Sequence, residues 1–307
     1  MKNNSLNRRE FLAKTSLATA AVASSQTALF AQKKELFKLS LAEWSFNKAL
    51  FGKKMSHMDF PQTAKTIYGI EAIELVNQFF MDKARDKQHL VEFKKRADGE
   101  GVKILLIMCD GEGNLGDPDS KKQSKAVENH HKWADAAKFF GCHSIRVNAE
   151  TGGIGTFEEQ QKRAAEGLTQ LSEYCSKLSL NCIVENHGRL SSNGSWLAGV
   201  MKQVNLPNCG TLPDFGNFDL GNGSTYDRYK GVEEMMPYAK AVSAKSNDFD
   251  AAGNETRTDY RRMLKIVLKA GYHGHLGIEY EGQRLSELDG VLATKNLLEK
   301  IRGELPA

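Results

Sequence analysis

Two short segments decide the fold: residues 181–188 read NCIVENHG, and residues 275–281 read HLGIEYE. In each segment a short apolar run ends in a glutamate, Glu185 or Glu279, just before a polar or glycine-containing turn. An ionised carboxylate at the end of a buried strand is costly to desolvate unless it meets a cation or takes part in chemistry. A third acid, Asp214, follows another apolar run in the same way. Three acids at three strand ends predict a single metal-binding or acid–base site.

Apolar runs with the character of buried strands recur along the chain. They span residues 37–42, 70–75, 102–108, 143–148, 181–186, 209–214, 239–245 and 275–280. Most of them lack an alternation of polar and apolar residues, which is typical of parallel strands buried on both faces. Helical patterns lie between the runs. The clearest of these patterns span residues 119–140, 158–178, 256–270 and 286–301.

This alternation of strands and helices predicts the fold class. Eight strand–helix units in one chain of this length indicate an α/β protein with a closed (β/α)8 TIM barrel. An open, doubly wound sheet is the alternative, but no Gly-x-Gly-x-x-Gly follows a first strand, which disfavours dinucleotide binding. Catalytic residues of barrels come from the C-terminal ends of the strands, where the three acids are expected.

The helical patterns also carry predictions about their ends and faces. Gly141, Gly271 and Gly303 each follow a helical run, where a left-handed C-terminal cap is expected. The pair His130–His131 lies within a charged helical stretch. We expect both histidines on the solvated face of that helix.

The N-terminus is predicted to be a separate segment, with residues 1–31 as an export signal and residues 32–307 as the barrel domain. Arg8 and Arg9 precede an apolar stretch of small residues at 17–30, as in twin-arginine signals. The stretch is too short and too rich in Ala, Ser and Thr for a stable membrane span. We therefore expect an exported, periplasmic protein with no stable membrane span after processing; a disordered or helical extension is the alternative.

Charge and cysteine content limit the class of partner. Residues 1–31 hold four basic residues and one acidic residue, so the rest of the chain keeps about +1 of the formal +4. This balance does not favour binding to nucleic acid or to an anionic membrane. The five cysteines include no Cys-x-x-Cys pair and are odd in number, which disfavours a disulfide framework.

The strand-end motifs together resemble the signatures of the sugar phosphate isomerase/epimerase family, in the xylose isomerase-like barrel superfamily. The motifs are IVENHG at 183–188, PDFGN at 213–217, GIEYE at 277–281, LAEWSF at 41–46 and IEL at 73–75. The resemblance covers about residues 36–302. The family includes ketose 3-epimerases, inosose dehydratases and hydroxypyruvate isomerases, so the motifs specify the superfamily and leave the substrate open.

The resemblance implies a divalent metal, Mn²⁺, Mg²⁺, Co²⁺ or Zn²⁺, bound by Glu185, Asp214 and Glu279 with a histidine from the seventh strand. Here Ser243 stands in the place of that histidine, while Lys245 keeps the lysine of the family's His-x-Lys-Asp pattern. A serine hydroxyl is a weaker ligand than imidazole. Several alternatives stay open: a metal held more weakly at a site that includes Ser243, a metal held through a water or by another residue, or a site without metal in which Lys245 supplies the positive charge.

Four further residues are expected to bind substrate. Trp44 is placed to form an apolar wall against a sugar face, and Glu74 to bind hydroxyl groups. His187, next to Glu185, is expected to contact a sugar hydroxyl or a metal-bound oxygen, with a structural role as the alternative. Lys245 is expected either to pair with the carboxylates or to contact a hydroxyl or carbonyl. For Trp44 and Glu74 an ordinary structural role is an equal alternative. Asn148 and Glu150, at the end of the fourth strand, are expected to line the pocket.

In the function that this implies, Glu185 and Glu279 act as the catalytic acid and base of a metal-assisted sugar isomerase or epimerase. Such an enzyme removes a proton beside a carbonyl and returns it. A lyase or dehydratase acting on a keto-sugar or inosose-like polyol would use the same first step. A non-catalytic sugar-binding barrel is the alternative from another class. The expected partner is a small carbohydrate, and assembly into a homo-oligomer stays open.

Overall fold

The computed structural model describes residues 36–305, and its centre is a sheet of eight parallel strands. The strand order is β6-β5-β4-β3-β2-β1-β10-β9. The strands are β1 Lys38–Ala42, β2 Ala72–Val76, β3 Lys103–Met108, β4 Ser144–Val147, β5 Asn181–Glu185, β6 Cys209–Leu212, β9 Val242–Ser246 and β10 His275–Tyr280. The sheet confirms the predicted TIM barrel. The predicted export signal, residues 1–31, lies outside the described residues.

The barrel closes between β6 and β9, and this seam is held differently from the other strand pairs. Isolated parallel bridges replace a continuous ladder there. The amide of Lys240 donates to the carbonyl of Thr211 at 2.9 Å, and the amide of Ser243 donates to that of Pro213 at 3.0 Å. The amide of Phe215 returns a bond to Ser243 at 3.1 Å. The seam therefore rests on a few bonds that lie just beside the predicted acids.

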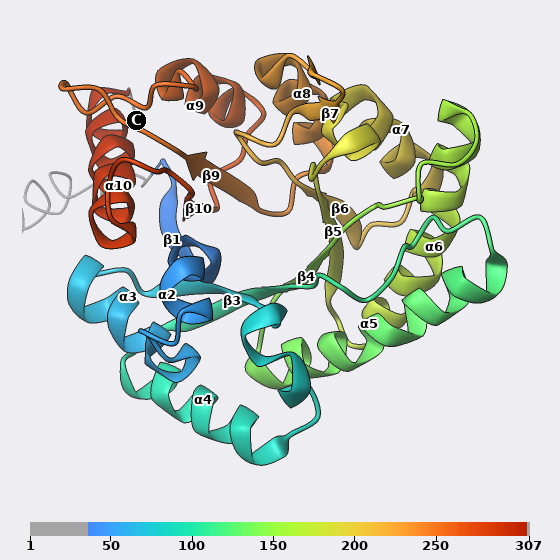
Figure 1. Cartoon of the computed structure of the whole chain (residues 1–307), viewed down its shortest axis with the longest axis horizontal. Coiled ribbons are helices and arrows are strands. Elements are labelled where there is room, and N and C mark those ends of the chain that lie inside the picture. The colour runs from blue at the N-terminus through green and yellow to red at the C-terminus, as the bar shows by residue number, and fades with distance from the viewer. Residues whose placement is uncertain (1–35, 306–307) are drawn as a thin grey trace, which may run out of the picture. The chain divides into compact units, whose positions relative to one another are not determined.

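Helices cover the outside of the strands, as Figure 1 shows. The α-helices are α2 Asn47–Phe51, α3 Phe60–Tyr68, α4 Lys87–Gly99, α5 Ser120–Phe140, α6 Phe157–Lys177, α7 Gly194–Val204, α8 Arg228–Met235, α9 Tyr260–Lys269 and α10 Glu287–Glu304. Short 3₁₀ helices are η1 Glu43–Phe46, η2 His57–Asp59, η3 Asn77–Lys83, η4 Arg189–Ser192 and η5 Met236–Tyr238.

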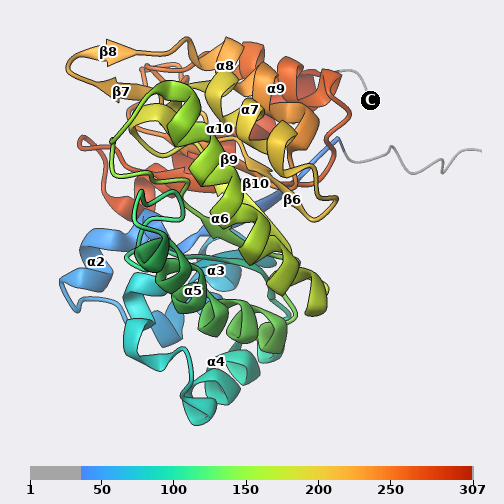
Figure 2. The ribbon, with the colours of Figure 1, turned by 90° about the vertical axis from the view of Figure 1, so that its right-hand side faces the viewer.

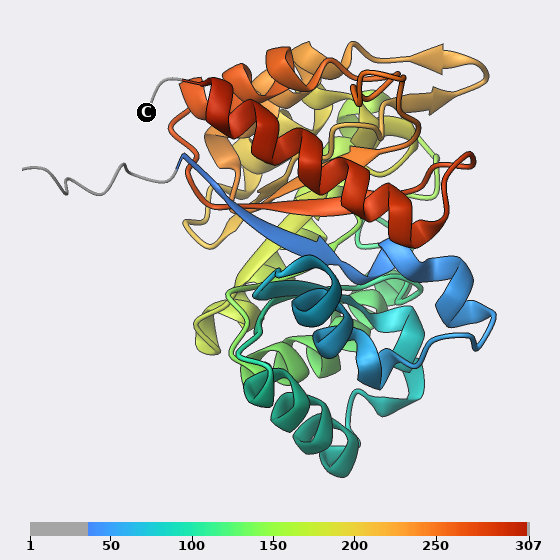
Figure 3. The same ribbon diagram turned by 90° about the vertical axis from the view of Figure 1, so that its left-hand side faces the viewer.

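The C-terminal ends of the strands share one face of the barrel with the longer loops. Figure 3 shows β1 and β10 pointing toward the side that carries α2. An antiparallel hairpin of β7 Asp219–Gly221 and β8 Ser224–Thr225 projects on the same side (Figures 2 and 3). The sequence did not predict this hairpin. It adds a wall to the barrel mouth.

The barrel interior is a packed apolar core and not a pore. A cluster of buried side chains from different strands occupies it: Ala42, Val76, Leu106, Met108, Ile183, Leu212 and Ala241. Leu106 and Met108 are two residues apart, so they point to the same face of β3. Trp44 lies in η1, directly after β1, and packs against this cluster. This core supports the floor of the barrel mouth.

One prediction about a helix face is wrong. His130 is only 2% exposed, and its Nδ1 lies 2.7 Å from the carbonyl oxygen of Ala126. It shares the buried stripe of α5 with Ala126 and Trp133, at the helical spacing of three and four residues. His131 is half-buried, and its ring stacks on Tyr174 with centroids 3.7 Å apart.

The predicted helix ends are correct in two of three places. Gly141 ends α5 with φ +80°, and Gly271 follows α9 with φ +82°. Gly303 lies inside α10, which continues to Glu304. The helical pattern in the sequence therefore predicts an end of α10 that comes earlier than its observed end at Glu304.

The described part of the chain bears on two further expectations. All five cysteines are buried and free, as expected for a chain without a disulfide framework. Among residues 36–305, no helix has both the length and the apolar character that a membrane crossing requires.

Candidate active site

Three acidic side chains meet at the C-terminal end of the barrel. Glu185 is the last residue of β5, Asp214 follows the end of β6 by two residues, and Glu279 precedes the last residue of β10. One carboxylate oxygen from each lies within 4.8 Å of the others. The three residues are buried, with exposures of 0%, 0% and 3%. The structure thus brings together the acids that the strand-end motifs singled out.

The backbone around Asp214 is fixed by its neighbours. The Asp214 Oδ1 atom accepts the amides of Gly216 at 2.9 Å and Asn217 at 2.8 Å, which makes a tight turn. The side chain of Asn186 accepts the Asp214 amide at 2.7 Å and donates to the carbonyls of Asp214 and Asn217. The polar residues of the ENHG and DFGN motifs therefore hold the ends of β5 and β6 together.

Two buried cations lie within the acidic cluster. Arg146, on β4, places its Nε 2.5 Å from Glu185 and its Nη1 2.8 Å from Asp110. Lys245, on β9, places its Nζ 2.9 Å from Glu279 and 3.2 Å from Glu281. Each of the two predicted catalytic glutamates therefore has a cation of its own.

Ser243 occupies the position that the resemblance assigns to a histidine ligand. Its hydroxyl donates to Asp214 Oδ2 at 2.6 Å and lies 3.4 Å from Glu279 Oε2. The residue is 1% exposed. The Ser243 hydroxyl therefore lies between the carboxylates of Asp214 and Glu279 and contacts both of them.

Burial and neighbouring charges set the protonation of the cluster. Burial raises the pKa of Glu279 to about 8, although Lys245 opposes the rise and Glu185 adds to it. Burial likewise raises the pKa of Asp214 to about 6, against the attraction of Lys245. Burial disfavours the charged forms of Arg146 and Lys245, but the carboxylates more than offset it and hold both pKa values above their ordinary range.

The donor set fits a hard divalent cation. Carboxylate oxygens are the ligands that Mg²⁺ and Mn²⁺ prefer. Asp214 Oδ1 accepts two hydrogen bonds, and each of the other five carboxylate oxygens of the three acids accepts one hydrogen bond or ion pair. Those five oxygens keep further lone pairs for a metal. The carboxylates also outnumber the two cations, so an added positive charge would relieve repulsion among them. The side chains that would hold such an ion are Glu185, Asp214 and Glu279, with the Ser243 hydroxyl beside them.

A cavity of about 250 Å³ opens above the cluster and is called the inner cavity below. Its lining includes Trp44, Val76, Gln78, Met108, Asp110, Gly111, Arg146, Asn148, Glu150, His187 and Glu279. Two predicted substrate-binding residues, Trp44 and His187, thus lie on its wall, together with Asn148 and Glu150. Of the three acids only Glu279 is among the residues that line the inner cavity. The Glu185 carboxylate is contacted by Arg146 and Asn217.

Trp44 and Lys245 are linked through a fourth acid. The indole nitrogen of Trp44 donates a short hydrogen bond to Glu281, whose other oxygen pairs with Lys245 at 3.2 Å. Lys245 also donates to Asn217 at 3.2 Å. Lys245 is therefore an electrostatic partner of the carboxylates, which is one of its two expected roles, and it is not among the residues that line the inner cavity.

Glu74 is placed apart from the inner cavity. It lies in the middle of β2, where its side chain accepts a 2.6 Å hydrogen bond from Ser40. Gly277 leaves room for it, because a Cβ there would come within 2.7 Å of the Glu74 carboxylate. Its second oxygen is buried without a hydrogen-bond partner, and burial raises the pKa of Glu74 to about 7. The structure thus buries Glu74 beneath the mouth.

Sequence reasoning missed Arg146, Asp110 and Asn217. Arg146 interrupts the apolar run SIRV of β4, and a charge inside a buried strand is the signal that could have revealed it. Asp110 follows β3 by two residues, as Asp214 follows β6. Asn217 is part of the quoted DFGN motif, and it donates to Glu185 at 2.8 Å.

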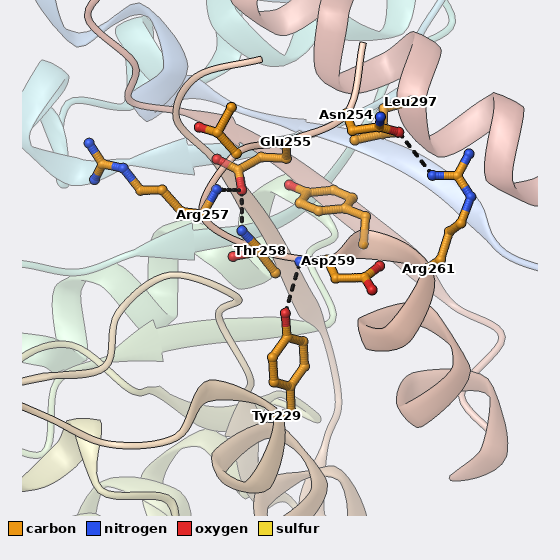
Figure 4. Close-up of a pocket in the computed structure, with 10 residues that line it drawn as sticks. Tyr229, Asn254, Glu255, Arg257, Thr258, Asp259, Arg261 and Leu297 are labelled. Carbon is orange, nitrogen blue, oxygen red and sulfur yellow. Dashed lines mark hydrogen bonds between the residues drawn. The ribbon is translucent and has the colours of Figure 1, made fainter. Parts of the chain in front are cut away.

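Another cavity, of about 510 Å³, lies at the N-terminus of α9 and shares no residue with the acidic cluster (Figure 4). Its polar groups serve local structure. Glu255 accepts the amides of Arg257 and Thr258, and Tyr229 accepts the amide of Asp259. These contacts hold the loop before α9 in its conformation. The cavity at α9 is therefore separate from the acidic cluster, which lies beside the inner cavity.

Comparison with known proteins identifies the family. The family model described as "Xylose isomerase-like TIM barrel" matches residues 62–302, and the chain therefore belongs to that family. This agrees with the resemblance carried by the strand-end motifs.

Solved structures share the fold at low sequence identity. A probable 3-DHS dehydratase, AsbF, from Bacillus anthracis is 18% identical, with a TM-score of 0.64 over 86% of this chain and 99% of its own. A D-tagatose 3-epimerase-like protein is 15% identical, with a TM-score of 0.68 over 87% and 98%. The IolI protein, which has a bound zinc atom, is 13% identical, with a TM-score of 0.69 over 88% and 100%.

One curated relative matches a short part of the chain. The C-glycoside deglycosidase alpha subunit of Arthrobacter globiformis is 38% identical over 55 residues. These residues are 18% of this chain and 16% of that protein, so the match spans about a sixth of the relative.

Proposed function

We propose that the protein is a carbohydrate isomerase or epimerase that moves a proton at a carbon beside a carbonyl. The observation that carries the proposal is the position of Glu279. It belongs to the buried cluster of three acids and also lines a cavity beside Trp44 and His187. Its pKa of about 8 lies near neutral pH, where a general acid or base is most effective.

In this proposal the ionised form of Glu279 takes the proton from the substrate. Its partner Glu185 returns a proton that it has taken up from solvent, once its carboxylate is released from Arg146 and Asn217. Before that release, the Glu185 carboxylate pairs with the Arg146 guanidinium at 2.5 Å. The Arg146 guanidinium also lines the inner cavity, where it would stabilise negative charge that develops on the substrate oxygen. A divalent ion bound by the three acids would polarise the carbonyl oxygen.

Exchange of solvent hydrogen tests the proposal. The protein is incubated with a panel of ketoses and aldoses in deuterated water, and deuterium in the sugar is followed by NMR. We expect incorporation beside the carbonyl for at least one sugar, and a loss of about 10²–10⁴-fold in rate for Glu279→Gln and Glu185→Gln. Glu173→Gln, at an exposed position of α6, is the matched control with full activity. Turnover without exchange, with both variants fully active, would contradict the proposal.

A lyase or dehydratase is the second candidate. The short match to a C-glycoside deglycosidase and the fold shared with a probable dehydratase support it. The same proton abstraction would then be followed by loss of a group from the neighbouring carbon. An unsaturated product in the NMR experiment, in place of an isomer, distinguishes the lyase. A barrel that only binds sugars would show neither product.

We also propose that the three acids bind a divalent cation, with lower affinity than a site that has a histidine. Titration calorimetry with Mn²⁺ should show one site that Glu279→Gln weakens. Ser243→His should strengthen it, because imidazole is the better ligand. If Mn²⁺, Mg²⁺, Co²⁺ and Zn²⁺ all fail to bind, Lys245 and Arg146 are the positive charges of the site.

We propose that the protein is exported to the periplasm by the twin-arginine pattern at Arg8 and Arg9. Mass spectrometry of the mature chain should find it shortened near residue 31. Replacing both arginines by lysine should leave the full-length chain in the cytoplasm. A full-length cytoplasmic chain without any substitution would exclude export.

A further inference from the structure

The barrel mouth holds a larger cavity beside the inner cavity. This outer cavity has a volume of about 890 Å³ and is lined by the loop after β4, the loop after β5, the start of α6 and the hairpin β7–β8. The two cavities share two lining residues, Glu150 and His187. They are therefore neighbours across these side chains, and together they form one cleft at the barrel mouth.

The two volumes suit different parts of a ligand. Pockets for drug-sized molecules measure roughly 300–1,000 Å³. The inner cavity, at about 250 Å³, lies below this range and suits a single small ring. The outer cavity, at about 890 Å³, lies near its upper end. A free monosaccharide at Glu279 would leave the outer cavity empty.

The lining of the outer cavity suits a ring with an apolar face and polar edges. Phe157, Leu190 and Leu220 contribute apolar surface from three different elements. Arg189 and Asn222 contribute polar groups. Within residues 36–305, the Arg189 guanidinium has no ion-pair partner, so it is free to donate to a ligand. Sugar rings and aromatic rings both bind between surfaces of this kind.

The walls are fixed by hydrogen bonds before any ligand arrives. The hydroxyl of Ser191 accepts the amide of His187 at 3.1 Å and donates to the carbonyl of Gly188 at 2.8 Å. On the opposite wall, buried Thr151 donates to Gln160 at 2.5 Å. Binding pockets for small molecules are usually preformed in this manner.

We propose that the natural ligand is a glycoside, with a sugar ring in the inner cavity joined to a second ring in the outer cavity. The linkage between the rings passes beside Glu150 and His187. That the sugar ring reacts rests on the proposed function and requires a carbonyl on that ring, as in a keto-sugar or a reducing-end sugar. The binding of the second ring requires neither. The second ring is a sugar or an aromatic group, and the experiment separates the two.

Titration calorimetry with matched ligands tests the inference. The panel contains the methyl glycosides of glucose, galactose, mannose and xylose in both anomers, the corresponding phenyl glycosides, and the disaccharides cellobiose, maltose and lactose. For at least one sugar, the ligand with a second ring should bind about tenfold more tightly than the methyl glycoside, because it buries additional apolar surface. Tighter binding of the phenyl ligand assigns an aromatic group, and tighter binding of the disaccharide assigns a sugar.

Two variants locate the second ring. Leu220→Trp narrows the outer cavity where the second ring would lie and should remove the tenfold advantage while leaving the affinity for the methyl glycoside unchanged. Leu288→Trp, at an exposed position of α10 outside both cavities, is the matched control and should keep the advantage.

Each outcome has a defined meaning. Equal affinity for ligands with one and two rings overturns the inference, as does a panel in which no ligand binds. An equal loss for both kinds of ligand in Leu220→Trp also overturns it. The methyl and phenyl glycosides carry no free carbonyl and report binding alone. Tight binding of a disaccharide through its reducing-end sugar, without deuterium exchange in that sugar, overturns the proposed function and leaves the inference standing.

Discussion

Arg146 is the residue with the greatest influence on the candidate site. It is buried on β4 and pairs with both Glu185 and Asp110. Burial opposes ionisation of Asp110, but the attraction of Arg146 outweighs it and lowers the pKa of Asp110 to about 2. One guanidinium thus contacts two carboxylates and keeps that of Asp110 ionised at the edge of the inner cavity.

Replacing Arg146 by Met should lower the free energy of unfolding by about 3–5 kcal/mol at pH 7, because two carboxylates lose their buried partner. Urea denaturation measures the change. Arg146→Lys, the matched control, keeps the charge but cannot pair with both acids in a fork, so it should lose less. A Met variant as stable as the unmodified protein would show that the ion pairs do not stabilise the fold.

Glu74 carries a pH effect of its own. Its pKa rises from 4.5 to about 7 because of burial, which corresponds to about 3 kcal/mol. The folded state holds this proton more tightly than the unfolded state. The contribution of Glu74 is therefore intact below pH 4.5 and is lost as the pH rises through 7.

Glu74→Gln should raise the free energy of unfolding by about 3 kcal/mol at pH 8 and leave it unchanged at pH 4. Glutamine keeps the hydrogen bond from Ser40 and never ionises. Denaturant titrations at both pH values measure the difference. Glu71→Gln, at an exposed position near the start of the same strand, should not show this pH dependence. The same stability gain at both pH values would mean that Glu74 is not protonated in the fold.

At the scale of single residues, the sequence was informative where a motif preceded a turn. Glu185, Asp214 and Glu279 could be predicted because each acid follows an apolar run at a strand end. Arg146 could not be paired with Glu185 in this way, because the two lie on neighbouring strands and only the register places Arg146 opposite Ile183. Glu74 lies two residues before the end of β2, so it is buried and does not line the inner cavity, which its place in the IEL motif does not reveal.

At the scale of elements, the hydrophobic pattern predicted where helices occur better than it predicted the residues at which they end. The stripe of α5 was visible in the sequence, and His130 falls on it between Ala126 and Trp133. The prediction that His130 faces solvent was wrong because it relied on the polar character of histidine and not on the position of the residue in the helix. The hairpin β7–β8 has only three and two residues in its strands, too few for a periodic pattern.

The two glycines Gly141 and Gly303 offer a matched test of the helix ends. Gly141→Ala should destabilise the protein by about 1 kcal/mol, because φ of +80° is unfavourable for any residue with a Cβ. Gly303→Ala should stabilise it by up to about 1 kcal/mol, because Gly303 is helical and a Cβ there meets nothing within 4 Å. Thermal unfolding of both variants checks the opposite signs. Equal effects would place the end of α10 before Gly303.

At the scale of the whole barrel, the fold could be predicted because its strands are buried on both faces. Eight apolar runs separated by helical patterns leave few arrangements other than a closed parallel sheet. The depth of the barrel mouth could not be predicted. It depends on how the loops after β4 and β5 and the hairpin β7–β8 stand around it, and no local pattern encodes that arrangement.

The seam between β6 and β9 has a kinetic consequence. Strand pairs joined by few hydrogen bonds open more often than continuous ladders, so backbone amides there should exchange with deuterated water sooner. By NMR, the amides of Lys240 and Ser243 should exchange before those of Leu276, in the central ladder of β10. Each opening separates Asp214 from Ser243, so the acidic cluster loses its geometry first. A ligand that binds Asp214 and Glu279 at the same time should link the two sides of the seam and slow this amide exchange.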